Sequence, residues 1–492
     1  MKLYLTGHDY RYAVEQMVMT LFPGERPVYP SGRPEGDRME VRLSEGEKRV
    51  TATCAFWVDG VCFRGMASVS NEMLTDKVRT ASLCQQIVKL AVYRAVLRSG
   101  RPKPPWGALS GVRPGKLLTA LLQKGLTEEE ALRRFRADYD VSAPRAALCL
   151  DAARETRRAI SSLEPNDVCL YVGIPFCPTR CAYCSFVSQA VEKNRTLMEP
   201  FLSALLQELK ATAEQVKACG LRVVSVYMGG GTPTTLSAAQ LDELCTALRQ
   251  EFDLSHQREF TVEAGRPDTI DEEKLRVLRR HGVSRVSVNP QTMTDDVLEA
   301  IGRKHTAADI VEALRHVRAV GGFQVNMDLI AGLPTDDEDG FRRTIDRVLA
   351  LEPENITVHT LSIKRGARLH FGEESLPSDE AVASMLDTAN TRLRAAGYRP
   401  YYLYRQKNMA GGFENTGWAK GDSVNLYNIC IMEELCSVLA MGAGGSTKLI
   451  RGNGGRNERM VAPKYPQEYI EAIGRLCADK EKITRFYAGS EE

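Results

Sequence analysis

The stretch Tyr171–Phe186 reads YVGIPFCPTRCAYCSF and carries three cysteines in the spacing C-x3-C-x2-C. An apolar, β-rich run comes first, and a loop with Cys177, Cys181 and Cys184 follows it. A structural zinc site and a conventional iron–sulfur cluster each take four protein ligands, and disulfides need pairs. The stretch therefore predicts an iron–sulfur site in which three thiolates hold a cubane cluster and one coordination position stays open.

A zinc site with a distant fourth ligand is the alternative for this triplet. The short loop crowds three ligands together, and no nearby histidine or cysteine completes a tetrahedron, which disfavours zinc. The other ten cysteines are scattered singly, and we interpret most of them as buried, small hydrophobic side chains. They are Cys54, Cys62, Cys84, Cys149, Cys169, Cys219, Cys245, Cys430, Cys436 and Cys477.

Around the triplet, short β-rich runs alternate with amphipathic helical patterns. The expected strands are 169–175, 223–230, 259–265, 285–290, 325–332 and 355–363. This alternation indicates βαβ units and a parallel sheet, and six units are fewer than a closed eightfold barrel needs. We therefore expect an α/β fold with a partial barrel or an open sheet. Its cysteine loop should lie at the carboxyl edge of the strands, where such folds place active sites.

The chain has 492 residues, enough for several domains. Residues 1–100 combine a short strand, a helix and a hairpin pattern, which predicts a small α+β domain. A helical connecting region is expected over 101–165 and the strand–helix repeats over 166–400. Residues 401–492 are expected to form a C-terminal cap region that lines the substrate pocket.

The overall composition excludes several classes of protein. Hydrophobic residues make up 43% of the chain and the net charge is +2, so the charge balance does not point to nucleic acid or an anionic membrane as partner. No run of about 18 apolar residues predicts a membrane-spanning helix, and the first residues lack the apolar core of a signal peptide. We expect a cytoplasmic protein.

With an aromatic residue, Tyr183, before its last cysteine, the triplet resembles the signature of the radical S-adenosylmethionine (SAM) enzymes. The resemblance implies that Cys177, Cys181 and Cys184 hold a [4Fe-4S] cluster whose open iron binds SAM. It implies that the cluster donates an electron and that a 5′-deoxyadenosyl radical forms. It also implies the partial (β/α)6 TIM-like radical SAM barrel, here with a small N-terminal α+β domain and a C-terminal extension.

The glycine run MGGGTPT, residues 228–234, follows the second expected strand. Consecutive glycines let backbone groups approach a ligand closely, although such a run alone is more often a simple turn. Its place one βα unit after the cysteines resembles the family's site for the methionine amino group. The candidate residues are Gly229, Gly230, Gly231 and Thr232.

Four polar residues farther along the chain are further candidates. Asp328 lies inside the apolar strand VNMDLIAG, where a carboxylate is unfavourable unless it is paired or bound to a ligand. Glu263 ends the third expected strand, and without a ligand it would be a solvated carboxylate. Without a ligand, Gln291 would be a turn amide and Arg303 a surface charge on a helix. His305, close to Arg303, is a further candidate for the cofactor site.

The order and spacing of these positions resemble the subfamily that contains oxygen-independent coproporphyrinogen III dehydrogenase and a related heme chaperone. In that subfamily the equivalent residues contact bound SAM, which implies this role for Tyr171, Glu263, Gln291, Arg303 and Asp328. Three further segments resemble the longer, HemZ-type branch of the dehydrogenases. They are 105–117, 401–421 and 425–449.

This resemblance implies an oxidative decarboxylation in which two propionate side chains of coproporphyrinogen III become vinyl groups without oxygen. It also implies a tetrapyrrole substrate with carboxylates and an electron donor such as flavodoxin or ferredoxin. Candidates for binding the carboxylates, which read equally as solvent-facing charges, are Lys364, Arg365, Arg405 and Lys407. Candidates for a flat apolar wall, or for a core strand, are Tyr401, Tyr402 and Tyr404.

Two alternatives stay open. The best-known dehydrogenases of this group carry a fourth cysteine where this chain has Phe186, and the heme chaperone also lacks it, so a heme-binding protein on the same scaffold is one alternative. The chaperone's His–Asn and Tyr–Trp heme motif is not found here, which favours the dehydrogenase. The other alternative is a radical SAM enzyme that acts on another tetrapyrrole or on tRNA, and the near-neutral charge disfavours RNA.

Overall fold

A computed structural model gives the fold of the chain. It describes residues 1–492 apart from 112, 185–188, 363–375, 407–411, 452–456 and 490–492. The chain divides into two compact units, Met1–Leu150 with Arg405–Phe413 and Asp151–Tyr404 with Glu414–Glu492. In the described part of the chain, no helix is both long and apolar enough to span a bilayer. The four-part division of the sequence stays a prediction.

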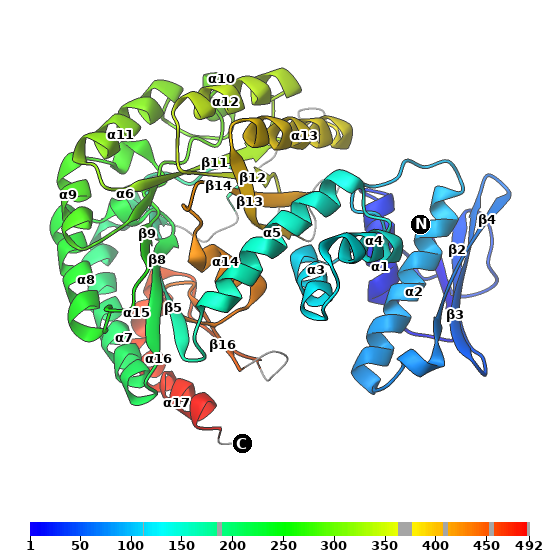
Figure 1. Ribbon diagram of the computed structural model, residues 1–492. Coiled ribbons are helices and arrows are strands. Elements are labelled where there is room, and N and C mark those ends of the chain that lie inside the picture. Colours follow the sequence, from blue (N-terminus) through cyan, green and yellow to red (C-terminus); the bar gives the residue numbers. More distant parts are fainter. Residues whose placement is uncertain (112, 185–188, 363–375, 407–411, 452–456, 490–492) are drawn as a thin grey trace. The chain divides into compact units, whose positions relative to one another are not determined.

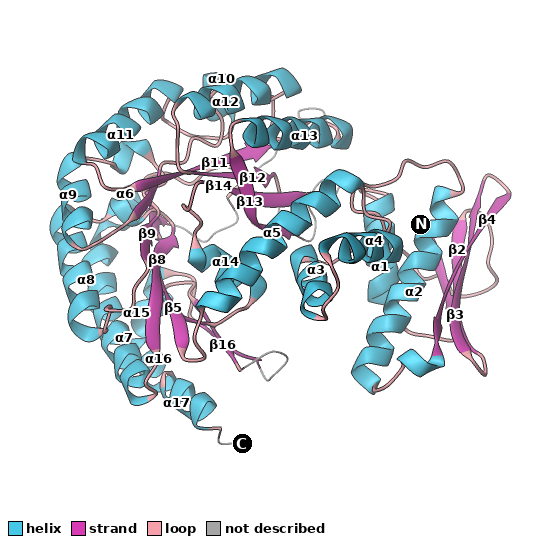
Figure 2. Ribbon diagram, in the orientation of Figure 1, coloured by secondary structure: helices cyan, strands magenta, loops and turns pink. Residues whose placement is uncertain are grey.

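The first unit contains one sheet and two long helices. Its sheet has the order β1-β2-β3-β4, with β1 parallel to β2 and the other neighbours antiparallel. The strands are β1 (Lys2–Thr6), β2 (Arg38–Glu45), β3 (Arg49–Val58) and β4 (Val61–Ser70). Alternate residues of these strands are buried, because α1 (Arg11–Leu21) and α2 (Lys77–Leu97) cover one face of the sheet (Figure 2).

Three more helices follow in the sequence, and a late segment completes the first unit. The helices are α3 (Pro114–Gln123), α4 (Glu128–Tyr139) and α5 (Ala143–Ser162), the last of which crosses into the second unit. Arg405 donates to the carbonyl oxygens of Leu109 and Gly412, and its guanidinium carbon lies 5.2 Å from the Trp106 ring centroid. Since Trp106 is fully buried, a residue far along the chain helps to close this small core.

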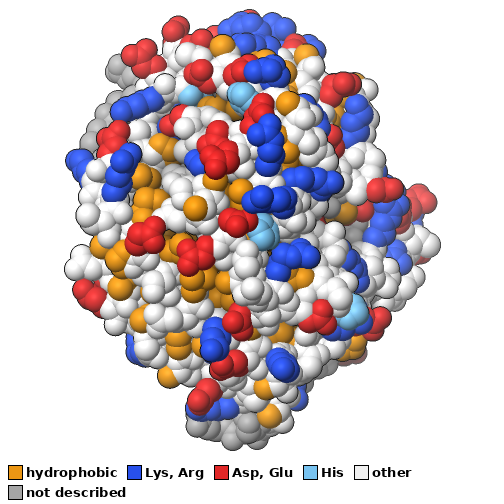
Figure 3. Space-filling view, turned by 90° about the vertical axis from the view of Figure 1, so that its left-hand side faces the viewer, with side chains coloured by type: hydrophobic (Ala, Val, Ile, Leu, Met, Phe, Trp, Pro, Cys, Tyr) orange, Lys and Arg blue, Asp and Glu red, His pale blue; other side chains and the backbone are white. Residues whose placement is uncertain are grey.

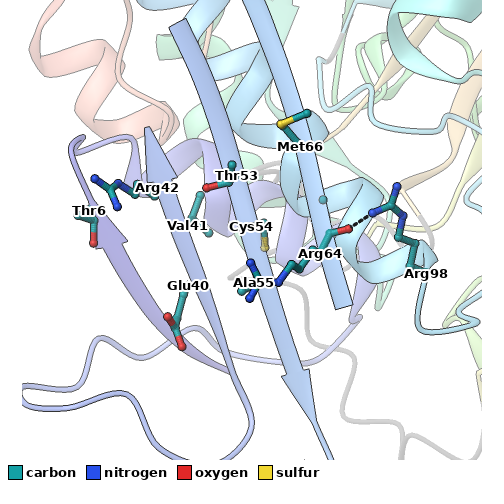
Figure 4. Close-up of a pocket in the computed structure, with 11 residues that line it drawn as sticks. Thr6, Glu40, Val41, Arg42, Thr53, Cys54, Ala55, Arg64, Met66 and Arg98 are labelled. Atoms are coloured by element: carbon teal, nitrogen blue, oxygen red, sulfur yellow. Dashed lines mark hydrogen bonds between the residues drawn. The ribbon is translucent and has the colours of Figure 1, made fainter. Parts of the chain in front are cut away.

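The first unit also contains a hollow on its sheet (Figure 4). Residues of all four strands and of the end of α2 line a space of about 490 Å³. Arg42, Arg64 and Arg98 contribute to its wall, with Glu40 as the acidic member. Arg98 donates to the Arg64 carbonyl oxygen, which holds it at the rim. The hollow therefore presents more positive than negative charge.

Six parallel strands form the centre of the second unit. In sheet order they are β12 (Asn355–Thr360), β11 (Gln324–Ala331), β10 (Arg285–Ser287), β9 (Glu259–Val262), β8 (Arg222–Gly230) and β5 (Asp167–Ile174). Nearly every residue of β5, β8 and β9 is buried, as is usual for parallel strands. All six runs were expected, so the strand–helix pattern predicted this sheet correctly.

A long helix follows each of these strands and lies outside the sheet (Figure 1). The six are α7 (Met198–Ala218), α8 (Ala238–Glu251), α9 (Glu272–Arg280), α11 (Ala307–Val320), α12 (Glu338–Ala350) and α13 (Asp379–Ala395). Five of them have an N-cap side chain that accepts a backbone N–H of the first turn; these caps are Ser237, Asp271, Thr306, Asp337 and Ser378. The predicted partial (β/α)6 arrangement is confirmed, and the described strands form no closed barrel.

Later strands extend the sheet at both edges. Next to β12 lies the antiparallel β14 (Glu414–Lys420), with β13 (Tyr398–Arg405) beyond it. Next to β5 lies the parallel β15 (Ser437–Gly442), followed by antiparallel β16 (Ser446–Ile450) and β17 (Asn457–Val461). Helix α14 (Leu426–Glu433) links β14 to β15. Three helices pack on α7, namely α15 (Pro466–Glu471), α16 (Ile473–Asp479) and α17 (Glu481–Ala488).

Candidate active site

The cysteine loop begins where β5 reaches the carboxyl edge of the sheet. The chain then forms β6 (Phe176–Cys177), which pairs with β7 (Gln189–Ala190) before the short α6 (Val191–Asn194). Cys181 is buried, and Cys177 and Cys184 are partly buried. The Ala182 N–H donates to the Ile301 carbonyl oxygen at 3.0 Å, which fastens the loop to the end of α10 (Asp295–Ala300). The three thiols thus lie at the sheet edge that the sequence predicts.

Cationic and hydroxyl groups surround these thiols. Arg266 Nη1 lies 3.8 Å from Cys181 Sγ, and Thr232 Oγ1 lies 3.5 Å from Cys177 Sγ. The Arg303 guanidinium donates to the Tyr183 hydroxyl at 3.2 Å. Burial lowers the pKa of Arg303, but the neighbouring Tyr183 and Cys181 outweigh this effect and raise it overall. The loop therefore combines three possible metal ligands with two nearby guanidinium groups.

Buried polar atoms near the loop lack partners among the described residues. Both ring nitrogens of His305 and the Nε of Arg303 are buried without a hydrogen bond. Burial, together with the charges of Arg303 and Arg266, lowers the pKa of His305 to about 3, so its ring is neutral near pH 7. Buried groups of this kind are usually satisfied by a ligand or water. The residues present therefore fit a metal cluster with a polar cofactor beside it.

The glycine run packs directly against the strand that leads to the cysteines. The N–H groups of Gly231 and Thr232 donate to the carbonyl oxygens of Ile174 and Phe176, each at 2.7 Å. A Cβ atom on Gly231 would lie 2.4 Å from the Phe176 oxygen, so no side chain fits there. The run thus positions the cysteine loop, and its contact with a methionine amino group stays a prediction.

Glu263 follows β9 and reaches toward the end of β8. Its carboxylate accepts hydrogen bonds from the Tyr227 hydroxyl and from the Gly230 N–H, the latter at 3.3 Å. A Cβ atom on Gly229 would lie 2.7 Å from Oε2, so a glycine there makes room for the carboxylate. Burial raises the pKa of Glu263 to about 7, and Asp328 adds to the rise, while the bond from Tyr227 opposes it. Glu263 therefore changes charge near neutral pH.

Three tyrosines stack beside this carboxylate. Tyr171 of β5, Tyr227 of β8 and Tyr427 of α14 have nearly parallel rings, and the Tyr227 and Tyr427 centroids are 4.4 Å apart. Tyr171 and Tyr227 are also register partners in the sheet. Of the three, the sequence reasoning identified Tyr171 and missed the other two. The stack gives the candidate site an aromatic wall.

Asp328 on β11 is held in its charged form. It accepts a hydrogen bond from Asn326 Nδ2 at 2.8 Å, and His359 Nε2 of β12 lies 3.9 Å from its Oδ1. Burial opposes ionisation, but the hydrogen bonds and charge of His359, with bonds from Asn326 and Thr357, outweigh burial and lower the pKa of Asp328. A partner within the sheet thus compensates this partly buried carboxylate.

Gln291 and Arg303 lie on the chain that follows β10. Gln291 has a φ of 67°, which is uncommon outside glycine, and its side chain is buried. Its N–H donates to the Asp328 carbonyl oxygen at 2.9 Å, and Arg303 Nη1 donates to the Asn289 carbonyl oxygen at 2.7 Å. Unusual backbone held by such bonds is typical of functional positions. The structure therefore places Gln291 next to Asp328 and Arg303 next to the cysteine loop.

Arg266 and His359 are site residues that the sequence reasoning missed. Arg266 comes three positions after Glu263, and His359 lies in the buried strand NITVHT. The rule applied to Asp328, that a polar group in a buried parallel strand needs a partner, would have identified His359 as well.

Of the residues expected to contact the substrate, the structure describes the three tyrosines and Arg405, all on β13. Tyr401 and Tyr402 are buried in a hydrophobic cluster, against which Tyr404 packs, and this favours the core-strand alternative. Arg405 is engaged within the first unit, as described above. The remaining candidates lie outside the described residues; they are Lys364, Arg365 and Lys407. Phe186, which takes the place of the fourth cysteine, also lies outside them.

Comparison with known proteins identifies the family to which the chain belongs. A model of the radical SAM superfamily matches residues 171–348. HemZ of Bacillus subtilis, named as an oxygen-independent coproporphyrinogen-III oxidase-like protein, is 38% identical over 382 residues, which cover 77% of this chain and 76% of HemZ. The chain belongs to the radical SAM superfamily. Its likeness to HemZ extends well beyond the radical SAM segment.

Two other relatives of this radical SAM protein have different names. HemW of Bacillus subtilis, a heme chaperone, is 32% identical over 51% of this chain and 66% of its own length. The structure of HemN from Escherichia coli, described as coproporphyrinogen III oxidase and a radical SAM enzyme, matches 65% of this chain and 72% of its own with a TM-score of 0.54 and 24% identity. The HemN likeness shows the shared α/β radical SAM fold.

The cofactors of this radical SAM protein are a [4Fe-4S] cluster and SAM, as its family membership establishes. The three thiols, the two arginines beside them and the unpartnered nitrogens of His305 fit this pair of cofactors.

Proposed function

We propose that the protein is an oxygen-independent coproporphyrinogen III dehydrogenase, which converts two propionate side chains to vinyl groups and yields protoporphyrinogen IX. The likeness to HemZ over three quarters of both chains is the observation that carries this proposal. Each conversion removes one hydrogen atom from the propionate arm and releases carbon dioxide and a further electron. The name given to HemN supports the same substrate class.

In this proposal the residues of the chain hold and orient the cofactors. Cys177, Cys181 and Cys184 bind three irons, and Arg266 offsets negative charge at Cys181. Glu263 and Asp328 accept hydrogen bonds from the donor groups of SAM. When bound, the cofactors supply the electron and the carbon-centred radical that start the reaction. The proposed SAM contacts are Tyr171, Gly229, Gly230, Gly231, Thr232, Glu263, Gln291, Arg303 and Asp328.

The proposed setting is the cytoplasm, with coproporphyrinogen III as substrate and a flavodoxin or ferredoxin as electron donor. Among the described residues on the face shown in Figure 3, basic and acidic side chains are interspersed rather than gathered by sign. The net charge of +2 agrees with this pattern. Both observations support a partner other than nucleic acid.

An anaerobic assay tests the proposed reaction. The cluster is reconstituted and reduced, SAM and coproporphyrinogen III are added, and products are followed by mass spectrometry. We expect about two 5′-deoxyadenosine molecules per protoporphyrinogen, since each propionate consumes one SAM. Cys181→Ser should form neither product, whereas Cys245→Ser, which changes a buried thiol of α8, should form both. Formation of 5′-deoxyadenosine without a decarboxylated product would contradict the assignment of coproporphyrinogen III as the substrate.

Heme binding is the second candidate, because HemW is a heme chaperone with 32% identity to half of this chain. Spectral titration of the reconstituted protein with heme tests it. A stoichiometric change that indicates axial ligation, without decarboxylase activity, would favour this function over the first. Absence of stable ligation would rule it out.

A further inference from the structure

Three cysteines outside the motif meet in the core of the second unit. Cys169 of β5, Cys430 of α14 and Cys436, just before β15, have Sγ atoms that all lie within 4.8 Å of one another. Cys169 Sγ and Cys436 Sγ are 3.6 Å apart, although the residues are 267 positions apart in sequence. All three are buried. Their interpretation as buried side chains is confirmed, but their convergence was not foreseen.

The spacing of these sulfurs suits one metal ion. Thiolates bind zinc-like ions at about 2.3 Å, which places sulfurs on one ion roughly 3.8–4.0 Å apart in tetrahedral or trigonal geometry. The observed separations, from 3.6 Å to at most 4.8 Å, include this range. Among the described residues, the motif cysteines do not belong to this closely spaced set, as expected for ligands of a larger cluster.

The fold fixes the three thiols from both ends of α14. At the start of the helix, Glu259 accepts the first two N–H groups at 2.9 and 2.7 Å. At its end, Glu434 has a φ of 57° and reverses the chain, and the next N–H donates to the Cys430 carbonyl oxygen at 3.1 Å. Cys436 follows directly and returns to the side of Cys430. The ligands are therefore positioned by backbone geometry rather than by a flexible loop.

The surroundings favour a soft ion. Val224, Tyr427 and Val438 belong to the same buried cluster as the three thiols. In the described part of the chain, no histidine or carboxylate joins the three sulfurs within 4.8 Å. Thiolates without oxygen ligands select ions such as Zn²⁺ or Cu⁺ over Mg²⁺ and Ca²⁺.

We propose that Cys169, Cys430 and Cys436 form a three-thiolate site for one thiophilic metal ion, either copper(I) in trigonal geometry or zinc that takes its fourth ligand from outside the cluster. The ion would join β5, α14 and the start of β15, and its binding would release the thiol protons to solvent. Cys169 lies two residues before Tyr171, and Cys430 lies three residues after Tyr427. The ion would therefore fix two of the three backbone segments that carry the tyrosine stack. The proposal is independent of the substrate of the enzyme.

Elemental analysis of the full chain tests the site. The protein is produced in medium supplemented with zinc or with copper, purified anaerobically, and analysed for iron, zinc and copper per chain. The same measurement is made on a variant in which Cys177, Cys181 and Cys184 are all changed to Ser. Zinc or copper that this variant retains cannot be bound by the motif cysteines. We expect about one zinc or copper in both proteins, and the supplement that fills the site identifies the ion.

Single substitutions then assign the ion to its ligands. Cys436→Ser and Cys169→Ser should lower bound zinc or copper to a trace, while Cys245→Ser, which changes a buried thiol outside this cluster, should retain it. X-ray absorption on the unsubstituted protein should show a sulfur shell at about 2.3 Å and does not depend on variants that fold poorly. The site is refuted if the protein binds no zinc or copper, or if the ion is lost with the motif cysteines.

Discussion

Glu263 is the residue of the candidate site whose charge responds most directly to pH. Its pKa is raised to about 7 from an ordinary value of 4.5, because burial disfavours the carboxylate. A raised folded pKa means that the folded chain holds its proton more tightly than the unfolded chain does. Stability that is present below pH 4.5 is therefore lost as the pH rises through about 7.

We predict that Glu263→Gln reduces this dependence. In the cluster-free chain, the free energy of unfolding should fall by up to about 3 kcal/mol between roughly pH 4.5 and pH 7.5, and by less in the variant. Urea unfolding at both pH values measures the difference. Equal pH dependence in the two proteins would show that another group titrates in this window.

Asp328 carries the prediction for cofactor binding. Asp328→Asn removes a charged acceptor that His359 keeps ionised, so SAM should bind roughly tenfold to a hundredfold more weakly. The iron content should not change, because Asp328 makes no contact with the cysteine loop among the described bonds. Equilibrium dialysis with the reconstituted protein measures this, with Asp296→Asn on the exposed side of α10 as control. Unchanged affinity would remove Asp328 from the site.

For single residues, the sequence predicts a functional role where the neighbouring residues in the chain already indicate it. Cys177, Cys181 and Cys184 carry their chemistry in their spacing, and Asp328 stands out against its own strand. Tyr427 and Cys430 carry no such local signal. They reach Tyr171 and Cys169 because β15 pairs with β5, which only the three-dimensional strand order shows.

Among the elements, the contact of the glycine run with the cysteine strand leads to a third prediction. Gly231→Ala would place a Cβ atom 2.4 Å from the Phe176 oxygen, and backbone atoms on both sides must then move. We expect a loss of about 1–3 kcal/mol in stability and a lower iron content after reconstitution. Gly474→Ala is the matched control, because no atom lies within 4 Å of its added Cβ and the residue is exposed in α16. Full iron content in Gly231→Ala would contradict the positioning role.

The start of α14 depends on a buried ion pair. Glu259 accepts from Arg285 at 3.1 Å as well as from the first two helix N–H groups. Glu259→Gln should destabilise the chain by about 3–5 kcal/mol, because it leaves the Arg285 charge without its partner. Denaturant unfolding measures the loss, and Glu312→Gln, in an exposed pair on α11, should have little effect. A similar stability of both variants would show that α14 is held in another way.

The elements also show where sequence patterns stop being informative. The six central strands were predicted because each is buried and followed by a periodic helix, so that the pattern repeats. The strands β13 to β17 extend the sheet on both sides without such a repeat, and β-propensity alone depends strongly on the surroundings of a strand. For residues 401–492 the sequence therefore predicted a C-terminal cap region but none of its individual strands.

For the whole molecule, Arg405 joins distant parts of the chain in one unit. Arg405→Ala would leave two carbonyl acceptors unpaired and remove the cation beside Trp106. We expect the first unit to lose about 2–3 kcal/mol, seen as earlier unfolding by tryptophan fluorescence. Arg49→Ala, on the exposed face of β3, is the control. Coincident unfolding curves for the unsubstituted protein and Arg405→Ala would mean that the first unit is stable without this residue.

The two-part make-up of the first unit also bears on synthesis of the chain by the ribosome. Its first segment ends at Leu150 and its second begins at Arg405, 255 residues later. At roughly 5–20 residues per second, the earlier segment waits about 13–51 s for its missing piece. During this delay the Trp106 side chain lacks its later neighbour, so the small core around it closes only after Arg405 has been synthesised.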